Sequence, residues 1–378
     1  MSKKNRVKRY SKIYRGYGRK KGTAFHVFIC FVLFVVVAFV VYLVAMGINS
    51  YVNRERCVEI EIAESSYESA EPDLKEADPE DAPPKKTEKI VAVELLADKL
   101  SNAKYVTEFI NKSKSEGKNA IVVPLKDENG ILLYPSQIPQ AREWGAISRS
   151  AVDARKIAAE IEAAGLIPIA KVNAFYDQTA PHFKRNNSYV YSSKKVTYLF
   201  TNPVTKRSER WLNPYESSAR KYICDIVAEV SELGYRQVFL NHVSFPPVEL
   251  NSKVGLGSDA KTKGEILRQF LAELNSRNVS YILAYDWRIF DQGNVADILY
   301  GGNISTYGAK NQAPLIDLNN RLNFAGGDGD PIKKFVECAR DIGSDVSIFP
   351  AVVSSNSDSK ILGELESFGI YSSLILNK

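Results

Sequence analysis

From residue 90 to residue 378 the chain alternates short apolar runs with segments whose apolar residues recur at helical spacing. The eight apolar runs are IVAVEL (90–95), AIVVPL (120–125), LIPIAKV (166–172), QVFLNHV (237–243), YILAYD (281–286), ADILYGG (296–302), VSIFPAV (346–352) and YSSLIL (371–376). Helices are predicted over 151–164, 217–233, 265–275 and 332–342, and a glycine follows three of them at 165, 234 and 343. A glycine and then a β-branched run is typical of a helix-to-strand junction. Eight such units predict an α/β fold, a (β/α)8 barrel of TIM type over residues 90–378, rather than an open doubly wound sheet.

Upstream of the predicted barrel, residues 25–48 contain no Asp, Glu, Lys or Arg. At about 1.5 Å per residue this stretch is long enough to cross a hydrocarbon core of about 30 Å. It is also longer than the apolar region of a cleaved signal peptide. Because ten basic residues and no acid precede it, the positive-inside bias predicts a signal-anchor. We therefore expect a cytoplasmic leader (1–24), one transmembrane helix (25–48) and an extracytoplasmic remainder, with the protein in the cell membrane.

Residues 49–89 are predicted to form an acidic stalk that contains proline. Between 55 and 88 there are twelve acids and four bases, with too few apolar side chains to form a core. The net charge of the chain is +6, from 50 Lys and Arg against 44 Asp and Glu, and the leader alone contributes +10. A nucleic-acid-binding protein carries its excess positive charge on a folded domain, so nucleic acid is not an expected partner.

The four cysteines and three histidines are scattered along the chain, and none has the spacing of a metal site. No cofactor and no metal are therefore expected. Cys224 and Cys338 both fall in predicted amphipathic helices. Buried thiols are the commoner state at such positions, although a disulfide between the two is the alternative outside the cell.

Side chains at the carboxyl ends of barrel strands, and in the loops that follow, face the site in TIM barrels. Aromatic rings among carboxylates and amides suit a sugar, because rings stack on its CH faces while polar groups bind its hydroxyls. The residues that follow the second to fifth predicted strands in this way are Lys126, Asp127, Glu128, Lys171, Asn173, Phe175, Tyr176, Asp177, Asn241, His242, Ser244, Asp286, Trp287 and Arg288. Tyr300, Asn303 and Tyr307 follow the sixth.

The segment WLNPYESSARKYICDIVAEVSELGYRQVFLNHVSFP (211–246) resembles the signature region of a family of bacterial TIM barrels described as "putative glycosyl hydrolase". AIVVPLKDENGILLYPS (120–136) resembles the family's strand and loop of the type VIDVKDDSG, and LAYDW (283–287) resembles a later strand that ends in Asp. The resemblance spans residues 90–378. It implies sugar cleavage by carboxylates at strand ends, and it adds Trp211, Asn213 and Tyr215 to the expected substrate-binding residues.

The chain departs from the family where it has Asn241 in place of an Asp. An amide cannot act as a nucleophile, and glycoside hydrolysis ordinarily needs two carboxylates. Three interpretations follow. The barrel is a pseudoenzyme that binds cell-envelope polysaccharide or peptidoglycan glycan; or it is an active glycosidase that uses Asp286 with Asp127 or Asp177; or it is a non-catalytic scaffold for a protein partner at the envelope.

Overall fold

The computed structural model describes residues 89–191, 196–202, 206–248, 254–255, 261–290, 293–317, 346–353 and 358–377. The predicted leader, membrane helix and stalk lie outside these residues, apart from the last residue of the stalk, Lys89, and so do Cys338 and the helix predicted over 332–342. Within the described ranges, no helix combines the length and apolar character needed to span a bilayer.

Eight parallel strands form a closed barrel, which confirms the predicted fold class. They are β1 (Val91–Glu94), β2 (Ala120–Lys126), β3 (Ile167–Asn173), β7 (Gln237–Asn241), β9 (Tyr281–Asp286), β10 (Asn311–Asp317), β12 (Ala351–Val353) and β13 (Ser373–Leu376). Each strand pairs with the next in this order, and β13 pairs with β1, where Leu374 lies opposite Ala92. A short strand, β11 (Ser347–Ile348), pairs with the beginning of β10.

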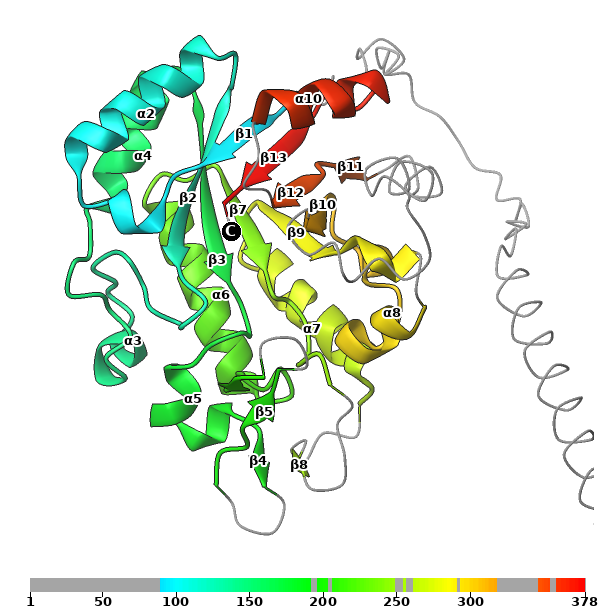
Figure 1. The fold of residues 1–378 in the computed structure, drawn as a ribbon. Helices are drawn as coiled ribbons and strands as arrows, with labels where there is room; N and C mark the ends of the chain where they lie inside the picture. The colour runs from blue at the N-terminus through cyan, green and yellow to red at the C-terminus, as the bar shows by residue number, and fades with distance from the viewer. Residues whose placement is uncertain are drawn as a thin grey trace, which may run out of the picture. The chain divides into compact units, whose positions relative to one another are not determined.

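Helices lie outside the strands (Figure 1). They are α2 (Ala103–Ser115), α3 (Pro139–Glu143), α4 (Ala154–Ala163), α5 (Ala180–Phe183), α6 (Ser217–Glu232), α7 (Lys263–Asn275), α8 (Gly293–Tyr300) and α10 (Asp358–Ser367), with 3-10 turns η1 (Ala97–Lys99), η2 (Arg185–Asn187), η3 (Trp287–Phe290) and η4 (Ile304–Thr306). Four two-residue strands, β4 (Val190–Tyr191), β5 (Phe200–Thr201), β6 (Ser208–Glu209) and β8 (Val254–Gly255), form two small sheets beyond one end of the barrel.

Successive side chains of each strand enter two different hydrophobic clusters, as the two-residue period of a strand requires. One cluster draws on all eight strands and fills the barrel: its members are Ile90, Ala92, Ala120, Val122, Ile167, Ile169, Phe239, Ile282, Ala284, Ala313, Phe349, Ala351, Leu374 and Leu376. The intervening positions, such as Val123 and Leu240, pack with helix residues that include Ile161 of α4 and Leu267 of α7. This alternation decides which polar residues face the barrel axis.

The prediction of a strand at 296–302 is wrong, because these residues belong to α8 and the turn that follows it. Ala296 of this helix is buried in the cluster between strands and helices. The sixth strand is β10, whose sequence NQAPLID lacks the β-branched character of a typical strand. The run at 346–352 forms two short strands, β11 and β12, separated by Phe349 and Pro350.

The helices predicted at 151–164, 217–233 and 265–275 correspond to α4, α6 and α7. Gly165 and Gly234 have φ of 78° and 103°, the left-handed conformation that ends a helix before the next strand. A capping box begins α7: the Thr262 hydroxyl accepts from the Glu265 amide, and the Glu265 carboxylate accepts from the Thr262 amide. Local sequence signals therefore set these three helices, and their position fixes where the strand ends meet.

Candidate functional site

Five polar residues continue the inward-facing alternation at the carboxyl ends of four strands. Glu94 lies two residues after Ala92 in β1, and Lys171 lies two residues after Ile169 in β3. Asn173, Asn241 and Asp286 occupy the corresponding last positions of β3, β7 and β9. We call these five residues the mouth cluster.

Glu94 and Lys171 form an ion pair across the barrel, with 2.8 Å between Lys171 Nζ and Glu94 Oε1. Their side chains are only 5% and 17% exposed, so each charge needs the other in this poorly solvated place. The second carboxylate oxygen of Glu94 accepts from the Asn377 backbone amide at 2.8 Å. Both oxygens of Glu94 are thus held by protein groups.

Asn241 belongs to a chain of amide hydrogen bonds at the end of β7. Its Nδ2 donates to Asn173 Oδ1 at 3.2 Å, and Asn173 Nδ2 donates to the Lys126 carbonyl at 3.1 Å. The Asn241 Oδ1 accepts from the His242 amide at 2.9 Å. The side chain of Asn241 is therefore used on both sides, as donor and as acceptor.

His242 follows Asn241 directly and has φ of 54°, a left-handed conformation that costs energy in a residue other than glycine. Its Nε2 lies 3.8 Å from Oε1 of Glu128 in the loop after β2. This neighbouring histidine is the main reason that the pKa of Glu128 is lowered, and the charge of Lys171 adds to the effect. Glu128 is 67% exposed, so it is the most accessible of these carboxylates, and it is ionised at neutral pH.

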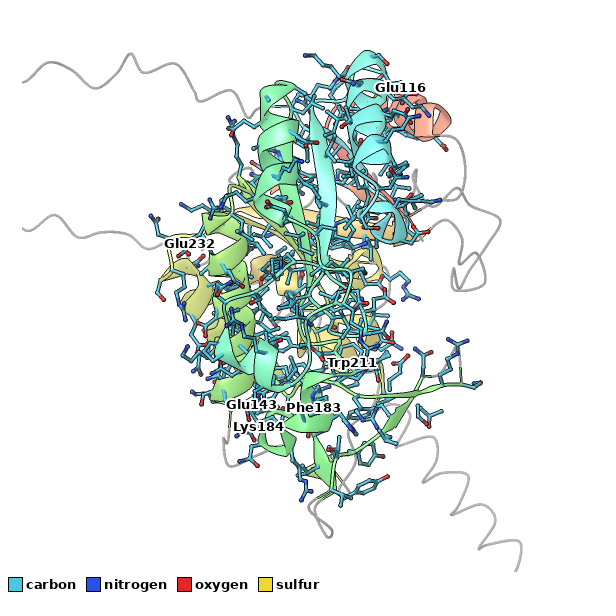
Figure 2. The ribbon with its side chains drawn as sticks, turned by 90° about the vertical axis from the view of Figure 1, so that its left-hand side faces the viewer. Glu116, Glu143, Phe183, Lys184, Trp211 and Glu232 are labelled. Carbon is cyan, nitrogen blue, oxygen red and sulfur yellow. The ribbon has the colours of Figure 1, made fainter. Side chains whose placement is uncertain are left out.

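Aromatic rings extend the site beside His242. The His242 ring lies 5.1 Å from the Tyr176 ring and 6.1 Å from the Trp211 ring, and Tyr176 and Trp211 are 4.8 Å apart. Tyr176 donates its hydroxyl hydrogen to Oε1 of the buried Glu209 at 3.0 Å. Burial and the charge of Glu209 raise the pKa of Tyr176 far above 10, so its phenol stays neutral. Figure 2 shows Trp211 toward the same end of the molecule as Phe183 and Lys184, and Glu116 at the opposite end.

Asp286 is held by Arg288, two residues further along the chain. Arg288 Nε contacts both oxygens of Asp286, at 2.9 and 3.0 Å, Arg288 Nη2 also donates to Oδ2, and the Arg288 amide donates to Oδ1 at 2.9 Å. The hydroxyl of Tyr300 accepts from the Asp286 amide at 2.9 Å. Asp286 thus faces the mouth as one half of a bidentate ion pair.

Asp127 and Asp177 serve the loops around the mouth. Oδ1 of Asp127 accepts from the Asn129 and Ile131 amides at 2.9 and 2.7 Å, which closes the turn after β2. Asp177 is fully buried, and its Oδ2 lies 2.8 Å from Lys126 Nζ. The geometry therefore gives both carboxylates a structural use.

Several of the remaining expected residues are buried, whereas Asn303 is exposed and caps the turn η4. Asn213, 1% exposed, accepts from the Tyr215 amide at 3.1 Å, and the Tyr215 ring packs 5.7 Å from Phe245. Trp287 is 2% exposed and packs in a hydrophobic cluster with residues such as Val93 and Leu365. The structure thus brings together Lys171, Asn173, Asn241, His242, Tyr176, Trp211 and Asp286. Trp211 and Trp287 are 4% and 2% exposed, so neither offers an exposed ring for stacking, and Trp211 supports the Tyr176 and His242 rings from behind.

Sequence reasoning missed Glu94 and Glu209. The signal for Glu94 is present, because it is the single acid in the first apolar run and lies two residues after an inward-facing alanine. Glu209 has no such signal, because it belongs to a two-residue strand in a long connection. In the described ranges, no three His, Cys, Asp or Glu side chains are grouped as a metal site.

Residues 92–292 match the sequence profile of a family described as "putative glycosyl hydrolase domain". No curated protein matches the chain. Among solved structures, the glycoside hydrolase domain of PgaB (BpsB) from Bordetella bronchiseptica is similar in fold, with a TM-score of 0.54, 14% identity and coverage of 76% of this chain and 93% of that one.

Two further structures have lower TM-scores. A hypothetical protein from Ruminiclostridium thermocellum is 21% identical, with a TM-score of 0.45 and coverage of 50% of this chain and 96% of that chain. The α-galactosidase TtGalA from Thermus thermophilus, in complex with stachyose, is 11% identical, with a TM-score of 0.49 and coverage of 77% and 62%.

Proposed function

Since the chain belongs to the family described as "putative glycosyl hydrolase domain", we propose that its barrel binds a cell-envelope carbohydrate at the mouth cluster without cleaving it. The ligand class is a polysaccharide, or the glycan of peptidoglycan. Residues 25–48 anchor the protein in the cell membrane, and the stalk over 49–89 holds the barrel on the extracytoplasmic side.

The observation that carries this proposal is the state of the strand-end carboxylates. Glycoside hydrolysis ordinarily needs one carboxyl group as acid and a second as base or nucleophile. The two inward-facing acids described at the mouth, Glu94 and Asp286, are each paired with a cation, Lys171 and Arg288. At the end of β7, Asn241 supplies an amide in a hydrogen-bonded chain. Glu128 beside His242 is the one exposed carboxylate described above, so the mouth offers polar groups for binding and no ready pair of acids for cleavage.

The aromatic wall supports a sugar as the ligand. Tyr176 is half-buried and packs against Trp211 and His242, so one ring system borders the amides and charges of the mouth cluster. Ligand sites combine apolar or aromatic surface with a few oriented polar groups, and this arrangement provides both. The left-handed backbone at His242 is a further mark of a functional position.

Equilibrium binding to insoluble peptidoglycan sacculi and to soluble chito-oligosaccharides tests the proposal with the purified full-length protein. We expect saturable binding without release of new reducing ends, and we expect Tyr176→Ala to weaken binding about ten-fold or more. Tyr371→Ala serves as the matched control. It removes a tyrosine that is 59% exposed and lies two residues before β13. Absence of binding to every glycan tested would favour a scaffold for a protein partner.

A further inference from the structure

The connection between β3 and α6 concentrates positive charge. Residues 178–213, which we call the β3–α6 excursion, contain seven basic residues and one acid, a net charge of +6. The whole range from 89 to 378 contains 35 basic and 32 acidic residues, a net charge of +3. The rest of the range from 89 to 378 therefore has a net charge of −3. The excess of positive charge is confined to the excursion.

Four of the excursion's described basic residues are exposed to solvent. Lys184, Arg185, Lys206 and Arg207 are exposed. The single acid, Glu209, is 6% exposed and accepts hydrogen bonds from Tyr176 and from Asn202 Nδ2, the latter at 2.7 Å. These four basic residues thus reach the surface, whereas the acid of the excursion is buried.

Aromatic and apolar side chains lie among these charges. Phe183 is 57% exposed, next to Lys184, and Figure 2 shows both at the same end of the molecule as Trp211. Tyr191 and Tyr198 are half-buried and their rings are 4.5 Å apart. Val196 and Leu199 are 42% and 40% exposed. The surface offers rings for sugar faces and cations for anionic groups.

The excursion is continuous with the mouth. Its base is tied to the residues just after β3: the Leu212 amide donates to the Phe175 carbonyl at 2.9 Å, and the Arg210 amide donates to Gln178 Oε1 at 2.9 Å. Trp211 forms a bridge with Tyr176, and both rings contact His242. The aromatic wall of the mouth and the basic surface are therefore parts of one structural unit.

We propose that the β3–α6 excursion extends the mouth into a binding surface for an anionic polysaccharide, one whose repeating units carry carboxylate or phosphate groups. This inference rests on the proposed function, and it adds the sign of the ligand's charge. A polymer is required because the proposed surface includes both the mouth cluster and the exposed Lys184 and Arg185 of the excursion. The aromatic rings would stack on the faces of the sugar units, and the cations would pair with the polymer's anionic groups.

The test compares polymers that differ in charge, using the full-length protein. Polygalacturonate carries a carboxylate on each sugar, its methyl ester has the same backbone without the charge, and poly(glycerol phosphate) teichoic acid supplies phosphate instead. We expect an anionic polymer to bind at least about ten-fold more tightly than the neutral ester, and this preference to shrink between about 0.05 M and about 0.5 M NaCl. The response of the two anionic polymers distinguishes carboxylate from phosphate.

The variant Lys184→Gln/Arg185→Gln should weaken binding of that anionic polymer roughly five-fold and leave binding of chito-oligosaccharides and of the neutral ester unchanged. Lys104→Gln/Lys112→Gln removes two exposed charges from α2 and should have no effect. Equal binding of charged and esterified polymer would overturn this inference while the proposed function stands. Failure of the wild-type protein to bind any glycan would overturn the proposed function itself. Binding only to phosphatidylglycerol vesicles would show that the excursion binds a lipid surface and not a polysaccharide.

Discussion

Lys126 and Asp177 form an ion pair of 2.8 Å in which neither side chain has any exposed surface. Lys126 Nζ also donates to the carbonyls of Asn173 and Ala174, at 2.8 and 3.3 Å, and Asp177 Oδ1 accepts from the Thr179 and Ala180 amides, each at 2.8 Å. The pair therefore joins the end of β2 to the end of β3 and to the start of the β3–α6 excursion. The pair thus fixes the loops that follow β2 and β3 at the mouth.

Breaking this pair should be costly. Asp177→Asn leaves a buried ammonium group without its charge partner, and removing one member of a buried pair typically costs about 3 to 5 kcal/mol. We expect the free energy of unfolding, measured with urea, to fall by about that amount. The double variant Lys126→Met/Asp177→Asn should lose less than the sum of the two single variants. A loss below about 1 kcal/mol in Asp177→Asn would contradict the anchoring role.

Gly130 closes over the same carboxylate. Its φ is 83°, and a Cβ atom at this position would lie 2.1 Å from Asp177 Oδ1, far inside contact distance. Gly130→Ala should therefore destabilise the fold by more than about 2 kcal/mol, because strain and a collision add together. Gly117 is the matched control, since its φ is 75° and a Cβ there meets nothing within 4 Å. Gly117→Ala should lower the free energy of unfolding only by the backbone strain, about 1 kcal/mol. Equal losses of stability in the two variants, measured by thermal or urea unfolding, would show that the contact with Asp177 does not matter.

Cys224 should be chemically silent in the folded protein. It is a free cysteine, 2% exposed in α6, and burial raises the pKa of its thiol from 9.0 to about 12. A raised pKa means that the neutral thiol persists at pH 8, whereas the thiolate is the reactive form. In a chain whose other three cysteines are serine, a thiol reagent should label Cys224 at least about a hundred-fold faster in urea than in buffer. Equal rates would show that the thiol is accessible.

The same shift has a consequence for stability at alkaline pH. The unfolded thiol loses its proton as the pH rises past about 9, while the folded thiol keeps it until the pH reaches about 12. Above pH 9 the unfolded state thus binds fewer protons, and stability falls. Cys224→Ala should reduce this alkaline loss in urea unfolding curves, and curves with identical pH dependence would contradict the shift.

Much of the barrel is predictable from local patterns. Runs such as 120–125 and 281–286 are apolar because parallel strands are buried on both faces, and the glycines at 165 and 234 mark helix ends. The prediction of the sixth strand failed for two reasons. The true strand, β10, contains Asn311, Gln312 and Pro314, which are uncommon in strands, and the more apolar run at 296–302 packs as a helix against the core. Tertiary pairing with β9 and β12, and not intrinsic propensity, makes β10 a strand.

The site was predictable only at the level of which residues come together. Strand-end position correctly gathers Lys171, Asn241 and Asp286 at one end of the barrel. It does not reveal that Asp177 lies buried against Lys126 or that Asp286 is held by Arg288, because ion pairing depends on loop paths that no local pattern fixes. The partner of Lys171, Glu94, is 77 residues away in sequence, so only barrel closure brings the two charges together.

The most direct test of binding without cleavage is the release of reducing ends from peptidoglycan sacculi and chito-oligosaccharides by the wild-type protein, measured beside Asn241→Asp and Asp286→Asn. We expect the wild-type protein to bind but to release nothing above a protein-free blank. Asn241→Asp should produce a measurable rate, because it introduces a carboxylate at the end of β7. Turnover by the wild-type protein that Asp286→Asn abolishes would contradict the account and identify an active glycosidase.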